Sequence, residues 1–398
     1  MASPKLRFKE FDGDWCISPL KNLCKINQGL QIAIEERFLE DAENRFFYIT
    51  NEFLRDGAKK SYFIENPPIS VRCKSEDILM TRTGNTGQVV TNVEGAFHNN
   101  FFKIDFDRKQ IDKNFFVEFL RKNTTQHLIL KYAGASTIPD LNHSDFYRIQ
   151  MPITSIDEQT KIASFLSAVD EKISQLTQKH ELLSQYKQGM MQKLFSQQIR
   201  FKADDGSEFG EWEDKPLNEI ASKRSGKNKD GSISEVLTNS ATQGIIKQSD
   251  YFEREIVTES NLNGYYIVNL DDFVYNPRIS VHAPVGPIKR NKKCLGVMSP
   301  LYTVFTVIQG NLKYLEYFFD SNFWHDYVKG VANSGARHDR MNITNKDFFD
   351  MPILYPCLEE QTKIANFLSA IDQKIEVVAQ QIEQAKTWKK GLLQQMFV

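Results

Sequence analysis

The sequence contains an internal repeat, and this repeat constrains the fold more than any other feature. Residues 158–173 read EQTKIASFLSAVDEKI, and residues 360–375 read EQTKIANFLSAIDQKI. Thirteen of these sixteen positions are identical, and KQGMMQKLF from Lys187 matches KKGLLQQMF from Lys389 at the same offset. Agreement without a gap over about forty residues excludes coincidence, so the chain arose by duplication.

Shorter matches extend the repeat upstream of each copy. DFYRIQMPI from Asp145 corresponds to DFFDMPI from Asp347, GAST from Gly134 to GARH from Gly335, and NFFVEFL from Asn114 to KYLEYFF from Lys313. Between these patches the copies share little. Each copy is therefore expected to be a variable globular unit followed by a nearly invariant helical segment, with boundaries at residues 1–155, 156–198, 199–355 and 356–398.

The repeat is circular in its arrangement. IRFKADDGSEFGEWEDKPL from Ile199 follows the first helical segment, whereas its match, LRFKEFDGDWCISPL from Leu6, stands near the N-terminus. If a two-fold axis relates the copies, the N-terminal segment must lie beside the end of the C-terminal helix. We therefore expect the chain ends to be close in space.

Apolar residues in both helical segments recur in alternating steps of three and four, the heptad spacing of paired helices. Ser155 and Glu158 form a capping-box pattern before the first segment, and Pro356 precedes the second. About 33 residues at 1.5 Å per residue give a helix of roughly 50 Å. The predicted pairing positions are Ile162, Leu166, Val169, Ile173, Leu176, Leu183, Ile364, Leu368, Ile371, Ile375, Val378 and Ile382.

These patterns predict an α+β protein. Two globular units of mixed strands and helices would be separated by two long helices packed as an antiparallel coiled coil with pseudo-two-fold symmetry. The globular units would then lie at opposite ends of the helical pair.

Composition limits the class of protein. A chain of 398 residues with 29 Phe can fill several cores. We found no apolar run near the roughly 20 residues of a membrane-spanning helix and no signal-peptide pattern, so we expect a cytoplasmic protein with no membrane partner. The five cysteines form no CxxC pair, and a net charge of -1 argues against nucleic-acid binding by bulk charge alone.

The duplicated segments EQTKIA..FLSA.D.KI and K.G...Q..F resemble the specificity subunits of type I restriction-modification systems, and the resemblance covers essentially the whole chain. It implies that residues 1–155 and 199–355 are target-recognition domains, each recognising one half of a bipartite site in double-stranded DNA. Residues 156–198 and 356–398 would be spacer regions that set the gap and dock two modification (methyltransferase) subunits, with two restriction subunits in some assemblies.

The same resemblance implies a chain without a catalytic centre, a metal or a cofactor of its own. S-adenosylmethionine would bind the modification subunits, which methylate adenine, and ATP and magnesium would bind the restriction subunits. The residues agree, since there is no GxxxxGK[ST] or GxGxxG motif and the histidines show no metal-ligand spacing. NPPI at residues 66–69 is similar to the active-site motif of adenine methyltransferases, but Ile69 replaces the stacking aromatic residue.

Candidate DNA contacts in the first globular unit follow a strand-like run at residues 78–80. Arginine pairs best with guanine, and asparagine or glutamine with adenine, so Arg82, Asn85 and Gln88 are the predicted base contacts. Thr81 and Thr86 are predicted near phosphates, although residues 82–88 could equally be a plain hairpin turn. The complete set in this unit is Thr81, Arg82, Thr83, Asn85, Thr86, Gln88, Asn99, Asn100, Asn142 and His143.

The second unit offers a comparable set. Arg278 is the strongest single candidate, and residues 287–293 form a cationic run suited to phosphates or to an ordinary solvated loop. In the aligned repeats Arg337 and Arg340 occupy the positions of Ser136 and Pro139. The predicted contacts are Asn239, Ser240, Thr242, Gln243, Asn276, Arg278, Ser280, His282, Lys289, Arg290, Lys292, Lys293, Arg337, His338, Arg340 and Asn342.

Two other functions are compatible with the sequence. The first is a non-catalytic tandem adaptor whose globular units bind protein partners on a coiled-coil strut, and near-neutral charge favours it. The second is a self-contained DNA enzyme, which the missing cofactor and phosphate motifs disfavour.

Overall fold

The computed structural model describes residues 3–55, 57, 60–134, 137–251, 259–333 and 339–398. It divides into two compact units, unit 1 with Met1–Gln178 and Ala379–Val398, and unit 2 with Lys179–Val378. Each unit combines one globular part with a stretch of both long helices, α5 (Ile156–Phe195) and α11 (Leu358–Met396). The two compact units therefore do not coincide with the four expected segments, because each long helix is divided between the units.

The globular part of unit 1 is built around the central strand β6 (Ile78–Thr81), whose residues are all buried. A short, continuous apolar run of this kind is typical of a strand covered on both faces. The sheets have the orders β2–β9–β6–β7, β4–β3–β8–β5 and β1–β10. Their other strands are β1 (Cys16–Pro19), β2 (Cys24–Gln28), β3 (Arg45–Ile49), β4 (Phe63–Glu65), β5 (Arg72–Cys73), β7 (Val89–Val90), β8 (Gly95–Phe97), β9 (Phe101–Phe106) and β10 (Gln150–Ile153).

Short helices complete unit 1. Asp112 caps α2 by accepting a hydrogen bond from the backbone N–H of Phe115 at 2.9 Å. The helices are α1 (Leu20–Leu23), α2 (Lys113–Arg121), α3 (Asn123–Ala133) and α4 (His143–Arg148), with 3-10 turns η1 (Ile34–Glu36) and η2 (Ile69–Val71).

Unit 2 repeats the inner part of this topology. The sheet β12–β19–β16–β17 corresponds to β2–β9–β6–β7, and the pair β11–β20 corresponds to β1–β10. The outer strands differ, with separate pairs β13–β14 and β15–β18. The strands are β11 (Glu213–Pro216), β12 (Ala221–Lys223), β13 (Leu237–Ser240), β14 (Gly244–Lys247), β15 (Tyr266–Val268), β16 (Phe273–Tyr275), β17 (Ile288–Arg290), β18 (Gly296–Met298), β19 (Thr303–Val307) and β20 (Pro352–Tyr355).

The helices of unit 2 are equally short apart from α5 and α11. They are α6 (Leu217–Ile220), α7 (Gln248–Tyr251), η3 (Glu259–Gly264), α8 (Leu312–Asp320), α9 (His325–Val331) and α10 (Asn345–Phe349). Together the two units confirm an α+β protein with two repeated domains. No helix in the described ranges is long and apolar enough to cross a membrane.

Each unit buries its stretches of α5 and α11 in the same core as its globular part. In unit 1, Phe397 of the C-terminal segment stacks on Phe115 of α2, with ring centroids 4.8 Å apart. Phe165 of α5 meets Trp388 of α11 edge to face at 5.9 Å. In unit 2, Phe195 at the end of α5 packs on Phe318 of α8 at 5.8 Å.

The long helices exceed the predicted length. They contain 40 and 39 residues, which at 1.5 Å per residue is about 60 Å each, because both helices continue through Gly189 and Gly391. The positions predicted to pair are turned inward: Ile162, Leu166, Val169, Leu176, Ile364, Leu368, Ile371, Val378 and Ile382 are buried, and Ile173, Leu183 and Ile375 are half-buried.

A buried carboxylate stands in the first turn of each long helix. Glu158 is 1% exposed and accepts hydrogen bonds from Arg7 at 2.7 and 2.8 Å and from Trp15 at 3.3 Å. Ser155 accepts from the backbone N–H of Glu158 at 3.3 Å, so only the serine half of the predicted capping box forms. Burial alone would raise the pKa of Glu158, but the hydrogen bonds from Arg7, Thr154 and Trp15 outweigh it and hold this pKa below its usual value.

The same arrangement recurs in unit 2. Glu360 is fully buried and accepts hydrogen bonds from Arg200 at 3.1 and 2.7 Å and from Trp212 at 2.9 Å. The segments beginning LRFK and IRFK therefore share a structural role. Each supplies the arginine and the tryptophan that hydrogen-bond to the buried carboxylate of its own unit.

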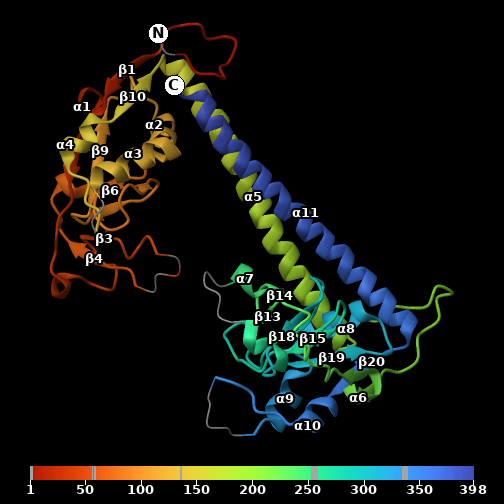
Figure 1. Cartoon of the computed structure of the whole chain (residues 1–398). Helices are drawn as coiled ribbons and strands as arrows, with labels where there is room; N and C mark the ends of the chain where they lie inside the picture. The colour runs from red at the N-terminus through yellow and green to blue at the C-terminus, as the bar shows by residue number, and fades with distance from the viewer. Residues whose placement is uncertain (1–2, 56, 58–59, 135–136, 252–258, 334–338) are drawn as a thin grey trace. The chain divides into compact units, whose positions relative to one another are not determined.

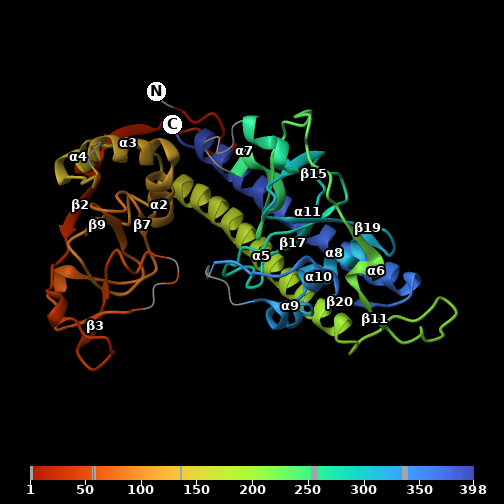
Figure 2. The same ribbon diagram turned by 60° about the horizontal axis from the view of Figure 1, so that its bottom comes forward.

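The N-terminal segment around Leu6 and the end of α11 meet within unit 1, as predicted (Figure 1, Figure 2). The backbone N–H of Leu6 donates to the carbonyl of Gln395 at 2.9 Å. In unit 2 the corresponding bond joins Ile199 to Lys193 at 3.2 Å within a continuous chain. The same joint is thus made without a covalent link in one copy and with one in the other.

Replacing Arg7 by methionine should destabilise unit 1 by about 3 kcal/mol, because a buried carboxylate loses its charged partner. The folded-state pKa of Glu158 is depressed, so its stabilisation is present above the unfolded pKa of about 4.3 and is lost as pH falls through the folded value. The difference between Arg7→Met and wild type should shrink below about pH 4. Urea unfolding of the full chain, followed by pulse proteolysis and detection of the cleavage products of unit 1, measures this stability difference. Arg200→Met, which acts on unit 2, is the control.

A circular permutant should fold like the natural chain when it joins Val398 to Pro4 through a glycine-serine linker and opens between Gln197 and Gln198. Its new ends copy the natural joint, whereas a permutant opened between Leu79 and Met80 cuts a buried strand and should not fold. Circular dichroism and the midpoint of thermal unfolding distinguish them. Equal behaviour of both permutants would contradict the equivalence of the two joints.

Candidate nucleic-acid interface

The loop at residues 82–88 of unit 1 is a tight connection between β6 and β7. Gly87 has φ +88°, and a side chain there would lie 2.9 Å from Gln126 and Ile129 of α3, so only glycine fits. Thr81 is fully buried, and its hydroxyl accepts from the backbone N–H of Gln88 at 2.9 Å. Thr86 is also buried and donates to the carbonyl of Pro139 at 2.6 Å. Both threonines therefore hold the loop together, which disfavours their predicted contacts with phosphate.

Arg82 is held by a carboxylate that sequence reasoning missed. Its guanidinium donates to both oxygens of Asp140, at 2.9 and 2.6 Å, and to Gln28 at 3.3 Å. The hydrogen bond from Arg82 holds the pKa of Asp140 below its usual value. Thr83 hydrogen-bonds to the same carboxylate. Arg82 and Thr83 thus present a pre-oriented pair at the surface, with Asp140 as their support.

His143 joins this cluster through Gln28, with 2.7 Å between its Nε2 and the Gln28 Oε1. Burial, with the charge of Arg82 as a second cause, lowers the pKa of His143. Asn99 donates to Gln31 at 2.9 Å, Asn100 accepts the backbone N–H of Arg82 at 2.7 Å through its own carbonyl, and Asn142 caps α4. In contrast, the side chains of Asn85 and Gln88 are exposed on the loop.

In unit 2 the predicted residues line a cavity of about 600 Å³. Eight of them belong to its wall, namely Asn239, Ser240, Thr242, Asn276, Arg278, Ser280, His282 and Arg340. The structure adds Gln248, Tyr265, Leu301 and Tyr302, which come from segments without a distinctive motif. A concave surface with arginines, amides and aromatic rings has the donors, acceptors and stacking faces that nucleic-acid bases use.

Two asparagines build this wall rather than face outward. Asn239 is 2% exposed, and its amide donates to the carbonyls of Val274 at 2.7 Å and Pro287 at 3.2 Å. Asn276 donates to the carbonyl of Asn239 at 2.9 Å and accepts the backbone N–H of Arg278 at 3.0 Å. They fix the start of the loop whose exposed polar members are Arg278, Ser280 and His282.

Matching backbone bridges show which residues of the two candidate interfaces correspond to each other. Thr83 bridges Asp140 in unit 1, and Arg278 bridges Arg340 in unit 2. The next bonds also match, because Leu141 donates to the carbonyl of Arg82 and Met341 to the carbonyl of Pro277, both at 2.9 Å. Arg340 is therefore equivalent to Asp140, not to Pro139 as the sequence alignment suggested. The alignment was displaced by one residue because five residues separate Gly134 from Asp140, whereas four separate Gly335 from Arg340.

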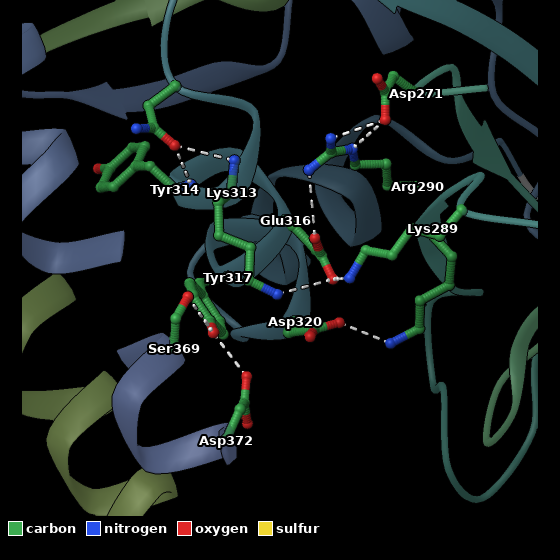
Figure 3. Close-up of polar contacts among 12 residues, drawn as sticks. Asp271, Lys289, Arg290, Lys313, Tyr314, Glu316, Tyr317, Asp320, Ser369 and Asp372 are labelled. Carbon is green, nitrogen blue, oxygen red and sulfur yellow. Dashed lines mark hydrogen bonds and ion pairs between the residues drawn. The ribbon is translucent and has the colours of Figure 1, made fainter. Parts of the chain in front are cut away.

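The cationic run of unit 2 is largely paired with helix α8 (Figure 3). Arg290 lies 2.7 Å from Asp271 and 3.7 Å from Glu316, and Glu316 also contacts Lys292. Lys289 lies 2.6 Å from Asp320. Lys293 is the exception, since its closest carboxylate among the described residues, Asp250, is 4.0 Å away. These pairs tie β17 to α8, and the predicted phosphate contacts by Lys289, Arg290 and Lys292 would have to compete with them.

The remaining predicted contacts are scattered. Gln243 and Asn342 are exposed outside the cavity wall, while Arg337 and His338 lie outside the described residues. Ile69 of the NPPI segment is 82% exposed at the start of η2. Within the part of the chain that the structure describes, no group of three or more His, Cys, Asp or Glu could hold a metal ion.

Comparisons with known proteins agree with the repeat. Residues 12–185 and 210–387 each match the family of the type I restriction modification DNA specificity domain. The chain is 26% identical over 409 residues to the type I restriction enzyme MjaVIII specificity subunit of Methanocaldococcus jannaschii, covering 97% of this chain and 94% of that protein.

Solved structures share the fold. A crystal structure of the S subunit of a type I restriction-modification system from M. genitalium has a TM-score of 0.57 at 16% identity, covering 100% of this chain and 99% of that one. A chain from a study of complex assembly and conformational transition of the type I R-M system has a TM-score of 0.56 at 15% identity, covering 95% and 96%.

Replacing Glu316 by glutamine should destabilise unit 2 by about 2 kcal/mol, because Arg290, Lys292 and Lys313 lose a shared, mostly buried carboxylate. Asp326→Asn is the matched control, since Asp326 is 98% exposed in its pair with Lys329 and should change nothing measurable. Thermal unfolding of the full chain tests both. An unchanged midpoint for Glu316→Gln would show that the run is not needed to hold β17 on α8.

Proposed function

The chain belongs to the family of type I restriction modification DNA specificity domains, and from this we propose that it is the DNA-recognition subunit of a methyltransferase and restriction assembly. Each globular part would recognise one half of a bipartite site in double-stranded DNA. The two family matches, one in each repeat, support a division of this kind.

One observation carries the proposal of two different half-sites. The equivalent bridges present Thr83 with Asp140 in unit 1 and Arg278 with Arg340 in unit 2. The backbone is thus the same while charge and hydrogen-bonding groups differ. Because base identity is read from donors and acceptors in the groove, equal backbones with unlike side chains favour unlike sequences.

The long helices would set the spacing between the half-sites. We infer that α5 and α11 pair as an antiparallel coiled coil along their whole length and dock two modification subunits. In support, the start of α5 packs with the end of α11 in unit 1, and Lys187 of α5 lies 2.6 Å from Asp372 of α11 in unit 2. Insertion of whole heptads should lengthen the gap, whereas one or two residues should break the register.

Catalysis would belong to the partners. In this proposal the modification subunits bind S-adenosylmethionine and methylate adenine, and restriction subunits, where present, use ATP and magnesium. This chain would supply neither cofactor nor metal, and it would act in the cytoplasm, where the DNA is.

A tandem adaptor for protein partners is the second candidate, favoured by a net charge of -1. Methylation of the source genome, read by long-read sequencing with the gene present and deleted, separates the two. Loss of one bipartite adenine-methylated motif with a fixed gap supports DNA recognition. Persistence of every motif in cells that express the assembly favours the adaptor.

Replacing Arg82 or Arg278 by alanine should relax recognition in one half-site each, by about 1 to 3 kcal/mol per lost base contact, or roughly 5- to 150-fold in discrimination. Methylation of a library of bipartite sites by the reconstituted assembly measures this. Lys172→Ala, an exposed change on α5, is the control. Equal loss in both halves from either variant would refute the division of labour.

A further inference from the structure

Unit 1 also contains a cavity, of about 340 Å³, and it lies outside the candidate interface at residues 82–88. It lies between the α2–α3 turn and the long helices, and its wall includes five cations, Arg121, Lys122, Lys386, Lys389 and Lys390. Two carboxylates, Glu118 and Asp170, also belong to the wall. The cavity is therefore cationic even with both acids ionised.

Both carboxylates form ion pairs with the same lysine. Lys389 lies 3.1 Å from Glu118 and 2.6 Å from Asp170. Burial raises the pKa of Glu118, and one of its oxygens accepts no hydrogen bond. Lys386 pairs with Glu383 at 3.0 Å, and Arg121 donates to the carbonyl of Val89 at 3.2 Å.

Lys122 has no such partner. It is only 9% exposed, and among the described residues no carboxylate or other acceptor meets its ammonium, which lies 5.7 Å from the ring of Phe397. Burial lowers the pKa of this lysine. Most of the Lys122 side chain is therefore buried, while its ammonium opens into the cavity without a counter-charge from the described residues, which leaves it available to an anion.

Helix α3 adds to the attraction. Lys122 is its N-cap residue, and no side chain caps its first backbone N–H groups. Uncapped N–H groups and the helix dipole together favour a negative group at this position. Lys122 and Asn123 thus bring a charged donor and a helix N-terminus to the same cavity wall.

The repeat shows that the scaffold does not require these cations. The caps Asp112 and Asn311 are equivalent, because each donates its backbone N–H to the corresponding glutamine, Gln159 or Gln361. Counting from these caps, unit 2 has Asp320 and Ser321 in place of Arg121 and Lys122.

The long helices show the same difference. By the helical repeat, Ser184 and Gln188 stand in place of Lys386 and Lys390. Only Lys389 has a cationic counterpart, Lys187, which keeps the equivalent contact with Asp372 at 2.6 Å. The other cations are thus peculiar to unit 1, as expected of a binding site rather than of the shared fold.

The cavity borders the candidate DNA interface. Gln126, one turn into α3, donates to the carbonyl of Gly87 at 2.9 Å, and Arg121 donates to the carbonyl of Val89, the residue that follows the same loop, at 3.2 Å. The loop at residues 82–88 and the cavity are thus connected through Arg121, the neighbour of Lys122.

We propose that this cavity binds a phosphate of the DNA backbone beside the half-site of unit 1, with Lys122 and the N-terminus of α3 as its ligands and Lys390 at its mouth. The site would anchor the duplex without reading sequence, and unit 2 would have no counterpart to it. This inference rests on the proposed DNA-recognition function.

The test measures binding of the full chain to a short duplex of random sequence, by fluorescence anisotropy between about 50 and 200 mM salt. Lys122→Met, which keeps the aliphatic stem against Phe397, should weaken binding about eight-fold at 0.1 M salt and reduce the salt slope by about 1. Lys390→Gln should act in the same direction. Lys172→Gln, with the same charge change on the exposed face of α5, should behave as wild type.

The outcomes separate this inference from the proposed function. Salt-dependent binding by wild type with Lys122→Met and Lys390→Gln equal to Lys172→Gln would overturn the phosphate site alone. Absence of salt-dependent binding by wild type would overturn both. Unchanged DNA binding with loss of association to the modification subunits would instead assign the cavity to an acidic group of a protein partner. If Lys122→Met does not fold, the exposed Lys390→Gln still decides.

Discussion

Each repeat depends on one buried carboxylate in the first turn of a long helix. Glu158 and Glu360 are essentially without solvent contact, and a buried charge without a partner costs several kcal/mol. The required arginine comes from the segment before the globular part, Arg7 in one copy and Arg200 in the other. This ion pair therefore fastens the beginning of each globular part to the helix that follows its end.

The same constraint explains why the chain ends meet. The segment with Arg7 must return to the start of α5, and its neighbour Leu6 then bonds to Gln395 near the end of α11. In the other copy the equivalent segment is reached by continuous chain through Ile199. A duplicated module of this kind needs each joint to be close in space, but it needs only one of them to be covalent.

On this common scaffold the two units carry different polar side chains at the positions that the proposed function assigns to DNA contact. Equivalent backbone bridges hold Asp140 in unit 1 and Arg340 in unit 2, and the cationic cavity around Lys122 has an acidic and a neutral residue at the matching positions. Aromatic packing and the buried ion pairs are shared, since they stabilise both units. Charges at the surface contribute less to folding and are free to diverge toward different DNA sequences and contacts.

The sequence by itself determined the duplication, both long helices, the α+β class and the meeting of the chain ends, because these follow from identity between copies and from local periodicity. It also placed Arg278 and its neighbours on one loop. Only the tertiary structure decided which polar side chains are free. Arg82 is held by Asp140, and Lys292 by Glu316, partners far along the chain. Hydrogen bonds and ion pairs between distant residues compete for such side chains, and separation along the sequence does not tell which pairs will meet.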